Sequence, residues 1–105
     1  MTNRVDKVDF YTEVYTVVAS IPSGSVLTYG QIASLAGRPQ CSRMVGQAMH
    51  NAPSGLPCHR VVNSQGRLAP FWVQQRELLE KEDVAFKKNG CVDLKKSCWD
   101  ILGKY

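Results

Sequence analysis

The sequence of 105 residues predicts a single winged helix-turn-helix domain that is mainly α-helical with a small amount of β-structure. Two short helical patterns meet at a glycine-containing turn, which is typical of a helix-turn-helix. A hairpin pattern follows them and predicts the wing. The length suits one hydrophobic core and the hydrophobic share of 44% is ordinary, so we expect residues 1–105 to form one domain.

The chain starts with a predicted helix over residues 9–19. Residues 21–24 (Ile-Pro-Ser-Gly) end this helix, and residues 25–27 form a brief β-prone segment. The apolar side chains that recur at the spacing of one helix face are Phe10, Val14, Val17 and Val18.

The helix-turn-helix is predicted next. Thr28 can cap a helix and form a capping box with Gln31, and this helix runs from residue 29 to 35 or 36 before Gly37. A second helix runs from residue 41 or 42 to 50 and takes the position of the recognition helix.

The second half of the chain supplies the wing and a tail. Residues 61–62 and 66–68 flank a polar turn and predict a hairpin, and residues 71–82 predict a helix with Leu78 and Leu79 facing inward. A second hairpin is predicted around Asn89-Gly90, the strongest short turn pattern in the chain. Its flanking segments are 84–86 and 91–94, and the residues expected to close the core are Trp99, Ile101 and Leu102.

The net charge of +4 is unevenly distributed. No Asp, Glu or Lys lies between Glu13 and Glu77, a segment that would meet a polyanion without self-repulsion. The alternative is a set of arginines scattered over the surface. The arginines of this segment are Arg38, Arg43, Arg60, Arg67 and Arg76.

Several classes of protein are disfavoured. No apolar run approaches the ~20 residues that span a bilayer, and the polar N-terminus lacks the apolar core of a secretory signal, so we expect a cytoplasmic protein with no membrane partner. The cysteines and histidines match no common zinc spacing, and we expect neither a metal nor a cofactor. The cysteines are Cys41, Cys58, Cys91 and Cys98, expected to be thiols in a reducing compartment.

Cys58 has an unusual setting, since Pro57 precedes it and His59 and Arg60 follow. A cysteine is nucleophilic as the thiolate, and a histidine can accept the thiol proton directly or through a water molecule. A buried, inert cysteine beside a structural histidine is the alternative, and spacing alone favours that alternative.

The complete string of residues 57–62, Pro-Cys-His-Arg-Val-Val, resembles the active-site signature of the O6-alkylguanine-DNA alkyltransferases. Further motifs occur in the order of that family, over about residues 9 to 83. They are Ile21, Pro22, Gly24, Val26 and residues 28–33 before and within the first helix of the pair; Ala36, Gly37, Ser42, Arg43, Val45, Gly46, Ala48, Met49 and Asn51 around the second; and Leu78, Leu79 and Glu82 in the last helix.

The resemblance implies a domain like the C-terminal domain of those enzymes, acting on double-stranded DNA that contains O6-alkylguanine. Cys58 would accept the alkyl group irreversibly, with His59 and Glu82 assisting deprotonation, after the base is flipped out of the duplex. Arg43 would fill the space left by the base, and Tyr29 would press on the neighbouring phosphate. The implied DNA contacts are Tyr29, Gln31, Ser42, Arg43, Asn51 and Arg60, with Asn51 bridging the recognition helix to the active-site loop, and the implied pocket residues are Pro57, Val61, Phe71 and Trp72.

The sequence departs from the family pattern after the wing. Residues 69–74 replace a loop with paired glycines that shapes the alkyl pocket, and Trp72 stands where a small donor is expected. The short chain and the tail at 84–105 are similar to the alkyltransferase-like proteins, which bind alkylated DNA without repairing it and carry tryptophan in place of the cysteine.

Three hypotheses for function therefore stand. The first is a monomeric single-turnover alkyltransferase, and the second is a lesion sensor that recruits nucleotide excision repair proteins. The third is a winged-helix transcription regulator, which would be a dimer with sequence-specific binding.

Overall fold

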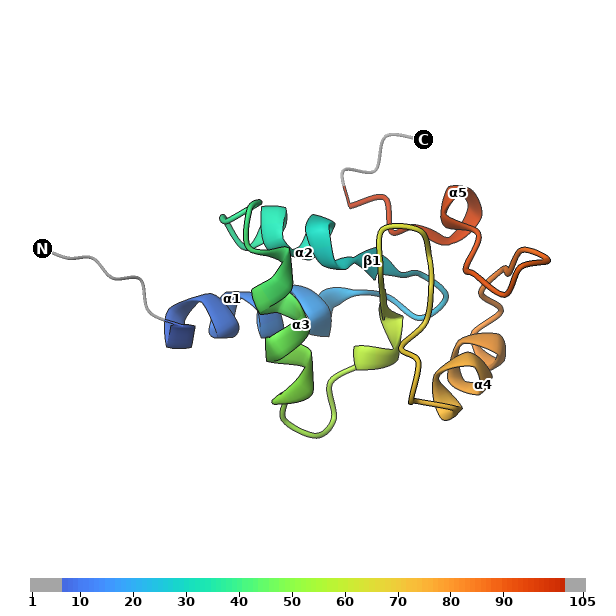
Figure 1. The fold of residues 1–105 in the computed structure, drawn as a ribbon, viewed down its shortest axis with the longest axis horizontal. Coiled ribbons are helices and arrows are strands. Elements are labelled where there is room, and N and C mark those ends of the chain that lie inside the picture. The colour runs from blue at the N-terminus through green and yellow to red at the C-terminus, as the bar shows by residue number, and fades with distance from the viewer. Residues whose placement is uncertain (1–6, 102–105) are drawn as a thin grey trace, which may run out of the picture.

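The computed structural model describes residues 7–101, for Lys7 and Val8 the backbone alone (Figure 1). The predicted class, mainly helical with a small sheet, is confirmed. The elements in chain order are α1 (Lys7–Ser20), β1 (Leu27–Thr28), α2 (Tyr29–Leu35), α3 (Ser42–His50), the 3₁₀ turn η1 (Cys58–Arg60), β2 (Val61–Val62), α4 (Gln74–Lys81) and α5 (Leu94–Ser97).

The helix-turn-helix forms as predicted, by α2 and α3. The hydroxyl of Thr28 accepts from the Gln31 backbone N–H at 3.1 Å, and the Gln31 side chain accepts from the Thr28 N–H at 2.9 Å. This capping box satisfies two amide groups that would otherwise lack partners at the start of α2. The start of the helix pair is thus determined by two residues that are three positions apart.

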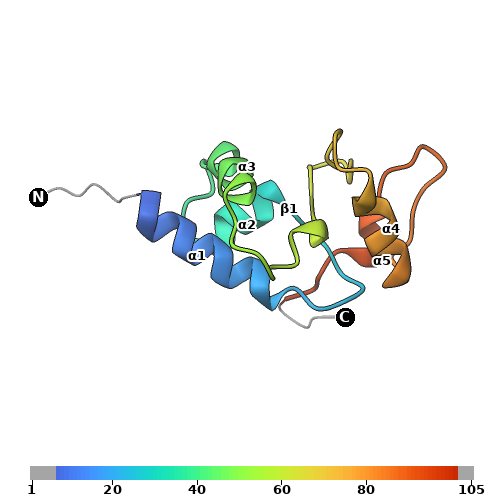
Figure 2. The same ribbon diagram turned by 90° about the horizontal axis from the view of Figure 1, so that it is seen from below.

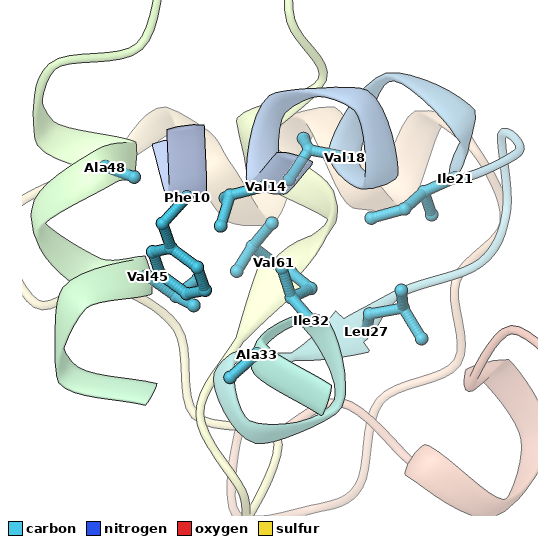
Figure 3. Close-up of a cluster of buried hydrophobic side chains, with 10 residues drawn as sticks. All are labelled: Phe10, Val14, Val18, Ile21, Leu27, Ile32, Ala33, Val45, Ala48 and Val61. Carbon is cyan, nitrogen blue, oxygen red and sulfur yellow. The ribbon is translucent and has the colours of Figure 1, made fainter. Parts of the chain in front are cut away.

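The main hydrophobic core lies where α1 packs against α2 and α3 (Figure 3). Val14 and Val18 of α1, Ile32 of α2 and Val45 of α3 are all fully buried. Val61 of β2 joins the same cluster, so the strand that follows the Cys58 turn is anchored in this core. A second cluster holds the other end of the chain, and its buried members are Val26, Val62, Leu79, Val84 and Val92.

The wing differs from the predicted hairpin. Val61 and Val62 pair in parallel with Leu27 and Thr28 rather than in antiparallel with residues 66–68. Both valines are buried, as are Leu27 and Thr28, so the parallel pair lies inside the fold, whereas a partner at residues 66–68 would include the exposed Arg67. Residues 63–67 instead form a turn, in which the Asn63 backbone N–H donates to the Arg67 carbonyl at 3.2 Å.

Helix α4 begins at Gln74, not at residue 71. The Gln75 side chain is fully buried and its Oε1 accepts from the Ala69 N–H at 2.7 Å, which holds residues 69–73 in a turn before the helix. Leu79 faces inward as predicted, whereas Leu78 is only half-buried.

The tail hairpin is present, with Phe86 and Val92 forming an antiparallel bridge. Leu94, expected in that hairpin, begins α5 instead. Trp99 packs against the main core as expected, but Ile101 is 43% exposed, because the chain leaves the core after residue 99. The expectation for Leu102 lies outside the described residues.

The elements are arranged with α1 along one side of the molecule and α3, the wing and the tail hairpin rising on the opposite side (Figure 2). The tail is joined to the sheet by a parallel bridge between Val26 and Cys98. No helix within residues 7–101 has the length and apolar character needed to cross a membrane.

Candidate nucleic-acid interface and cysteine pocket

A cavity of about 500 Å³ lies between α2, α3, the Cys58 turn and the loop before α4. Small-molecule sites typically have volumes of about 300–1,000 Å³, so the cavity is large enough for a purine base. Most of its lining is apolar or aromatic, which suits a flat ring. The residues that line it are Tyr29, Gly46, Met49, His50, Cys58, Val61, Ala69, Pro70, Phe71, Trp72 and Gln75.

Cys58 opens the 3₁₀ turn η1, directly before buried strand β2. Its side chain is half-buried and lines the cavity. Burial raises the pKa of the Cys58 thiol above its usual value, so the protein without DNA holds this group as a thiol at neutral pH. No disulfide joins any of the four cysteines, each of which lies within the described residues.

His59 and Arg60 both bind Glu82, which follows α4. Nε2 of His59 lies 2.9 Å from Oε2 of Glu82, and Arg60 donates to both carboxylate oxygens at 2.9 and 2.6 Å. The backbone N–H of Gly24 donates to the same carboxylate at 3.3 Å. The three side chains are 14–17% exposed, which makes this a largely buried ionic cluster.

The cluster keeps Glu82 ionised. The Arg60 hydrogen bonds lower the pKa of Glu82 most, burial opposes them, and His59 and Gly24 lower it further, to about 2. A carboxylate that stays charged can orient the His59 ring by accepting a hydrogen bond from its Nε2.

Arg60 therefore faces inward. Besides Glu82, it donates to the carbonyl of Ile21 at 2.7 Å, so all three of its nitrogen atoms have partners within the protein. This geometry argues against the expected DNA contact of Arg60 and makes it a structural cation.

The other residues expected at DNA lie on or near the helix pair. Ser42 and Arg43 are exposed in the first turn of α3, and Tyr29 lines the cavity at the start of α2. Burial raises the pKa of the Tyr29 hydroxyl, so it remains a proton donor at neutral pH. Gln31 is exposed but bound in the capping box, and its Nε2 lies 3.2 Å from the Cys98 sulfur.

Asn51 does not bridge to the active-site loop. Its side-chain amide donates to the Gln47 carbonyl at 2.9 Å, within the last turn of α3, and its backbone N–H donates to the same carbonyl at 3.3 Å. The expected pocket residues Val61, Phe71 and Trp72 line the cavity, whereas Pro57 is half-buried outside it.

The comparisons with known proteins agree with this geometry. The family model described as the DNA-binding domain of 6-O-methylguanine DNA methyltransferase matches residues 9–84. The chain belongs to this family. The helix-turn-helix, the Cys58 pocket and the Glu82 cluster all lie within the matched range.

Relatives within the family carry different names. The DNA base-flipping protein of Escherichia coli is 39% identical over 92% of this chain and 80% of its own length. Alkyltransferase-like protein 1 of Schizosaccharomyces pombe is 45% identical over 72% of this chain and 77% of its own. A methylated-DNA–protein-cysteine methyltransferase of Salmonella typhimurium is 38% identical over 70% of this chain, which spans only 46% of that enzyme.

Solved structures show the same relationship. The S. pombe Atl1 complex with damaged DNA containing O6-carboxymethylguanine superposes with a TM-score of 0.77, at 36% identity over 89% of this chain and 96% of that one. The Mycobacterium tuberculosis OGT complex with DNA gives a TM-score of 0.67, at 36% identity over 71% of this chain and 49% of that one. This member of the family therefore has the DNA-binding alkyltransferase-like fold.

Sequence reasoning missed two residues that shape this family member's site. Gln75 donates through Nε2 to the carbonyls of His59 and Val61, at 3.1 and 3.0 Å, and so ties the Cys58 turn to the loop before α4. Tyr15 donates to the Ala48 carbonyl at 2.9 Å and joins α1 to α3 behind the pocket. A glutamine at an inward position of a predicted helix could have indicated the first, but no pattern indicates the second.

Proposed function

We propose that this protein binds DNA, takes an O6-alkylguanine base into the Cys58 cavity and transfers the alkyl group irreversibly to the Cys58 sulfur. The observation that carries the proposal is a thiol on the wall of an apolar, base-sized cavity, next in the chain to a histidine bound by an ionised glutamate. The family's enzymes act on methylated DNA by name, and this chain retains a cysteine within the matched range.

The residues can move the protons that this reaction needs. Because Glu82 is ionised, Nε2 of His59 would carry the proton and donate to it, leaving Nδ1 to accept the thiol proton of Cys58 directly or through a water molecule. The thiolate attacks the alkyl carbon, the new S–C bond replaces the C–O6 bond, and the bonding electrons leave with guanine. The Tyr29 hydroxyl, a cavity residue that stays protonated, can then protonate the leaving base.

The DNA would lie across the face that α3 presents. A guanine within a duplex cannot place O6 against Cys58, so the base must leave the stack. Arg43, exposed at the start of α3, would occupy the vacated space, and Ser42 would contact the backbone beside it. Phe71 is 96% exposed at the cavity rim, where the flipped base would cover it.

Intact-mass measurement tests the transfer. After incubation with a duplex containing O6-methylguanine, the protein should gain about 14 Da on Cys58, the mass of one methylene, because a flipped base places its alkyl carbon at the thiol. Cys58→Ser serves as the matched control and should bind the duplex without a mass change. Tight binding of the wild-type protein with unchanged mass would refute the transfer.

A second function is favoured by the raised pKa of Cys58, since a protonated thiol is a poor nucleophile. In that case the protein is a lesion sensor that holds the alkylated base and recruits nucleotide excision repair proteins. The same assay separates the two functions, because a sensor discriminates damaged from undamaged duplex without forming an adduct. Equal affinity for both duplexes would contradict both functions.

A further inference from the structure

A second groove, of about 550 Å³, lies between the wing turn and the tail hairpin. The tail side of this groove is outside residues 9–84, the range that the family model matches. The residues that line it are Ser64, Gln65, Arg67, Lys87, Asn89, Cys91, Val92, Asp93, Leu94 and Lys95.

The groove is basic. Arg67, Lys87 and Lys95 contribute three exposed cations, and Asp93 is the one acidic residue among the lining side chains. The carboxylate of Asp93 caps α5 by accepting from the Lys95 backbone N–H at 3.2 Å. An anion in the groove would therefore meet an excess of positive charge.

The two walls of the groove are held together rigidly. The Val92 N–H donates to the Gly66 carbonyl at 2.8 Å, so the wing turn and the tail hairpin share a backbone hydrogen bond. Gly66 has φ +83°, and a Cβ at this position would overlap the Val92 carbonyl oxygen. Only glycine allows this approach, so the backbones of the wing turn and the tail hairpin lie in direct contact.

The segments that form the groove lie on the side of the molecule that carries the recognition helix. In Figure 2 the wing and the tail hairpin rise on the same side as α3, away from α1. A duplex that lies over α3 and the wing would pass close to the cations of the hairpin.

We propose that this groove binds the phosphodiester backbone of duplex DNA beside the base-flipping site and so extends the footprint of the protein. The proposal rests on the proposed function only in taking DNA as the ligand. A protein segment is a poorer fit, because protein–protein sites bury aromatic or large apolar anchors. Val92 is fully buried and Leu94 half-buried, so the groove offers exposed charge rather than an apolar pocket.

The test compares two double variants with the same net charge. Lys87→Gln/Lys95→Gln changes lysines of the groove, and Lys88→Gln/Lys96→Gln changes exposed neighbours that do not line it. Affinity for an undamaged duplex is measured against salt concentration. Each lost phosphate contact should lower the slope of log K on log salt by about 0.9, so the groove pair should lose nearly 2 from the slope.

At 0.15 M salt the same slope predicts an affinity loss of about 10- to 30-fold for the groove pair and a clearly smaller loss for the neighbour pair. Amine-reactive footprinting of the wild-type protein provides a measurement without substitutions, in which DNA should protect Lys87 and Lys95 more than Lys88 and Lys96. Equal losses of affinity in the two variants, or equal protection of the two lysine pairs by DNA, would overturn the proposal. A groove variant with wild-type affinity for DNA would also overturn it, and is the result expected if the groove binds a protein instead.

The lesion preference keeps this test separate from that of the proposed function. The groove pair should retain the wild-type ratio of affinities for damaged and undamaged duplex, since the groove lies outside the base pocket. A wild-type protein without lesion preference would contradict the proposed function, and the salt slopes would still decide whether the groove binds DNA.

Discussion

Replacing Glu82 by glutamine should both destabilise the protein and alter how its stability depends on pH. The substitution keeps the shape of the side chain and removes the charge that binds His59 and Arg60. Arg60 would then remain largely buried without a counter-charge, which is the costly way to break a buried ion pair.

The magnitude follows from the pKa of Glu82. A pKa lowered from 4.5 in the unfolded chain to about 2 in the folded protein corresponds to about 3 kcal/mol of stability at neutral pH. This contribution is fully present above about pH 5 and is lost as the pH falls toward 2, because the unfolded chain takes up the proton first. For a domain near 100 residues, a loss of about 3 kcal/mol lowers Tm by about 10–20 °C.

Urea unfolding between pH 7 and pH 2.5 measures both effects. Glu82→Gln should be less stable at pH 7, and its free energy of unfolding should fall less than that of the wild type between pH 5 and 2.5. Glu80→Gln is a matched control on α4, where an exposed i,i+4 pair with Arg76 contributes only about 0.5 kcal/mol. Equal stability of Glu82→Gln and Glu80→Gln at pH 7, or parallel pH curves for Glu82→Gln and the wild type, would show that the Glu82 charge does not stabilise the fold.

Other substitutions test the remaining parts of the site. Gln75→Leu leaves the buried carbonyls of His59 and Val61 without donors, so it should cost about 2–4 kcal/mol and weaken lesion binding, as urea unfolding and a binding titration would show. Gly66→Ala should destabilise by more than about 1 kcal/mol and expose the tail to proteolysis; an unchanged cleavage rate would mean that the wing and tail are not coupled. Arg43→Ala should reduce lesion discrimination more than total DNA affinity, and a parallel loss of both would reduce Arg43 to a phosphate contact.

Two local patterns in the sequence predicted the local structure correctly. The capping box of Thr28 and Gln31 and the turn at Asn89-Gly90 depend on residues a few positions apart, and both form. The errors arose where distant residues decide. Val61 pairs with Leu27 across 34 positions of the chain. Helix α4 starts late because Gln75, which also donates to the carbonyls of His59 and Val61, holds the preceding loop.

The chemistry of the site was only partly visible in the sequence. The resemblance to the alkyltransferases indicated Cys58, His59 and Glu82, and the structure brings His59 and Glu82 into contact. The sequence could not show that Arg60 binds the same carboxylate, because an arginine is equally suited to binding a phosphate. Only the three-dimensional arrangement separates these roles.

The three-dimensional arrangement also changes how the charge pattern of the sequence is interpreted. Two of the five arginines in the acid-free segment are bound to glutamates near the C-terminal end of α4, Arg60 to Glu82 and Arg76 to Glu80. The cations left for a polyanion in that segment are fewer than the sequence suggests. The tail supplies further lysines, although it also carries acidic residues and lies outside the acid-free segment. Because α3, the wing and the tail hairpin rise on one side of the fold, DNA bound over α3 should also meet the tail, and the tail should contribute to DNA affinity through the lysines that line the groove, Lys87 and Lys95.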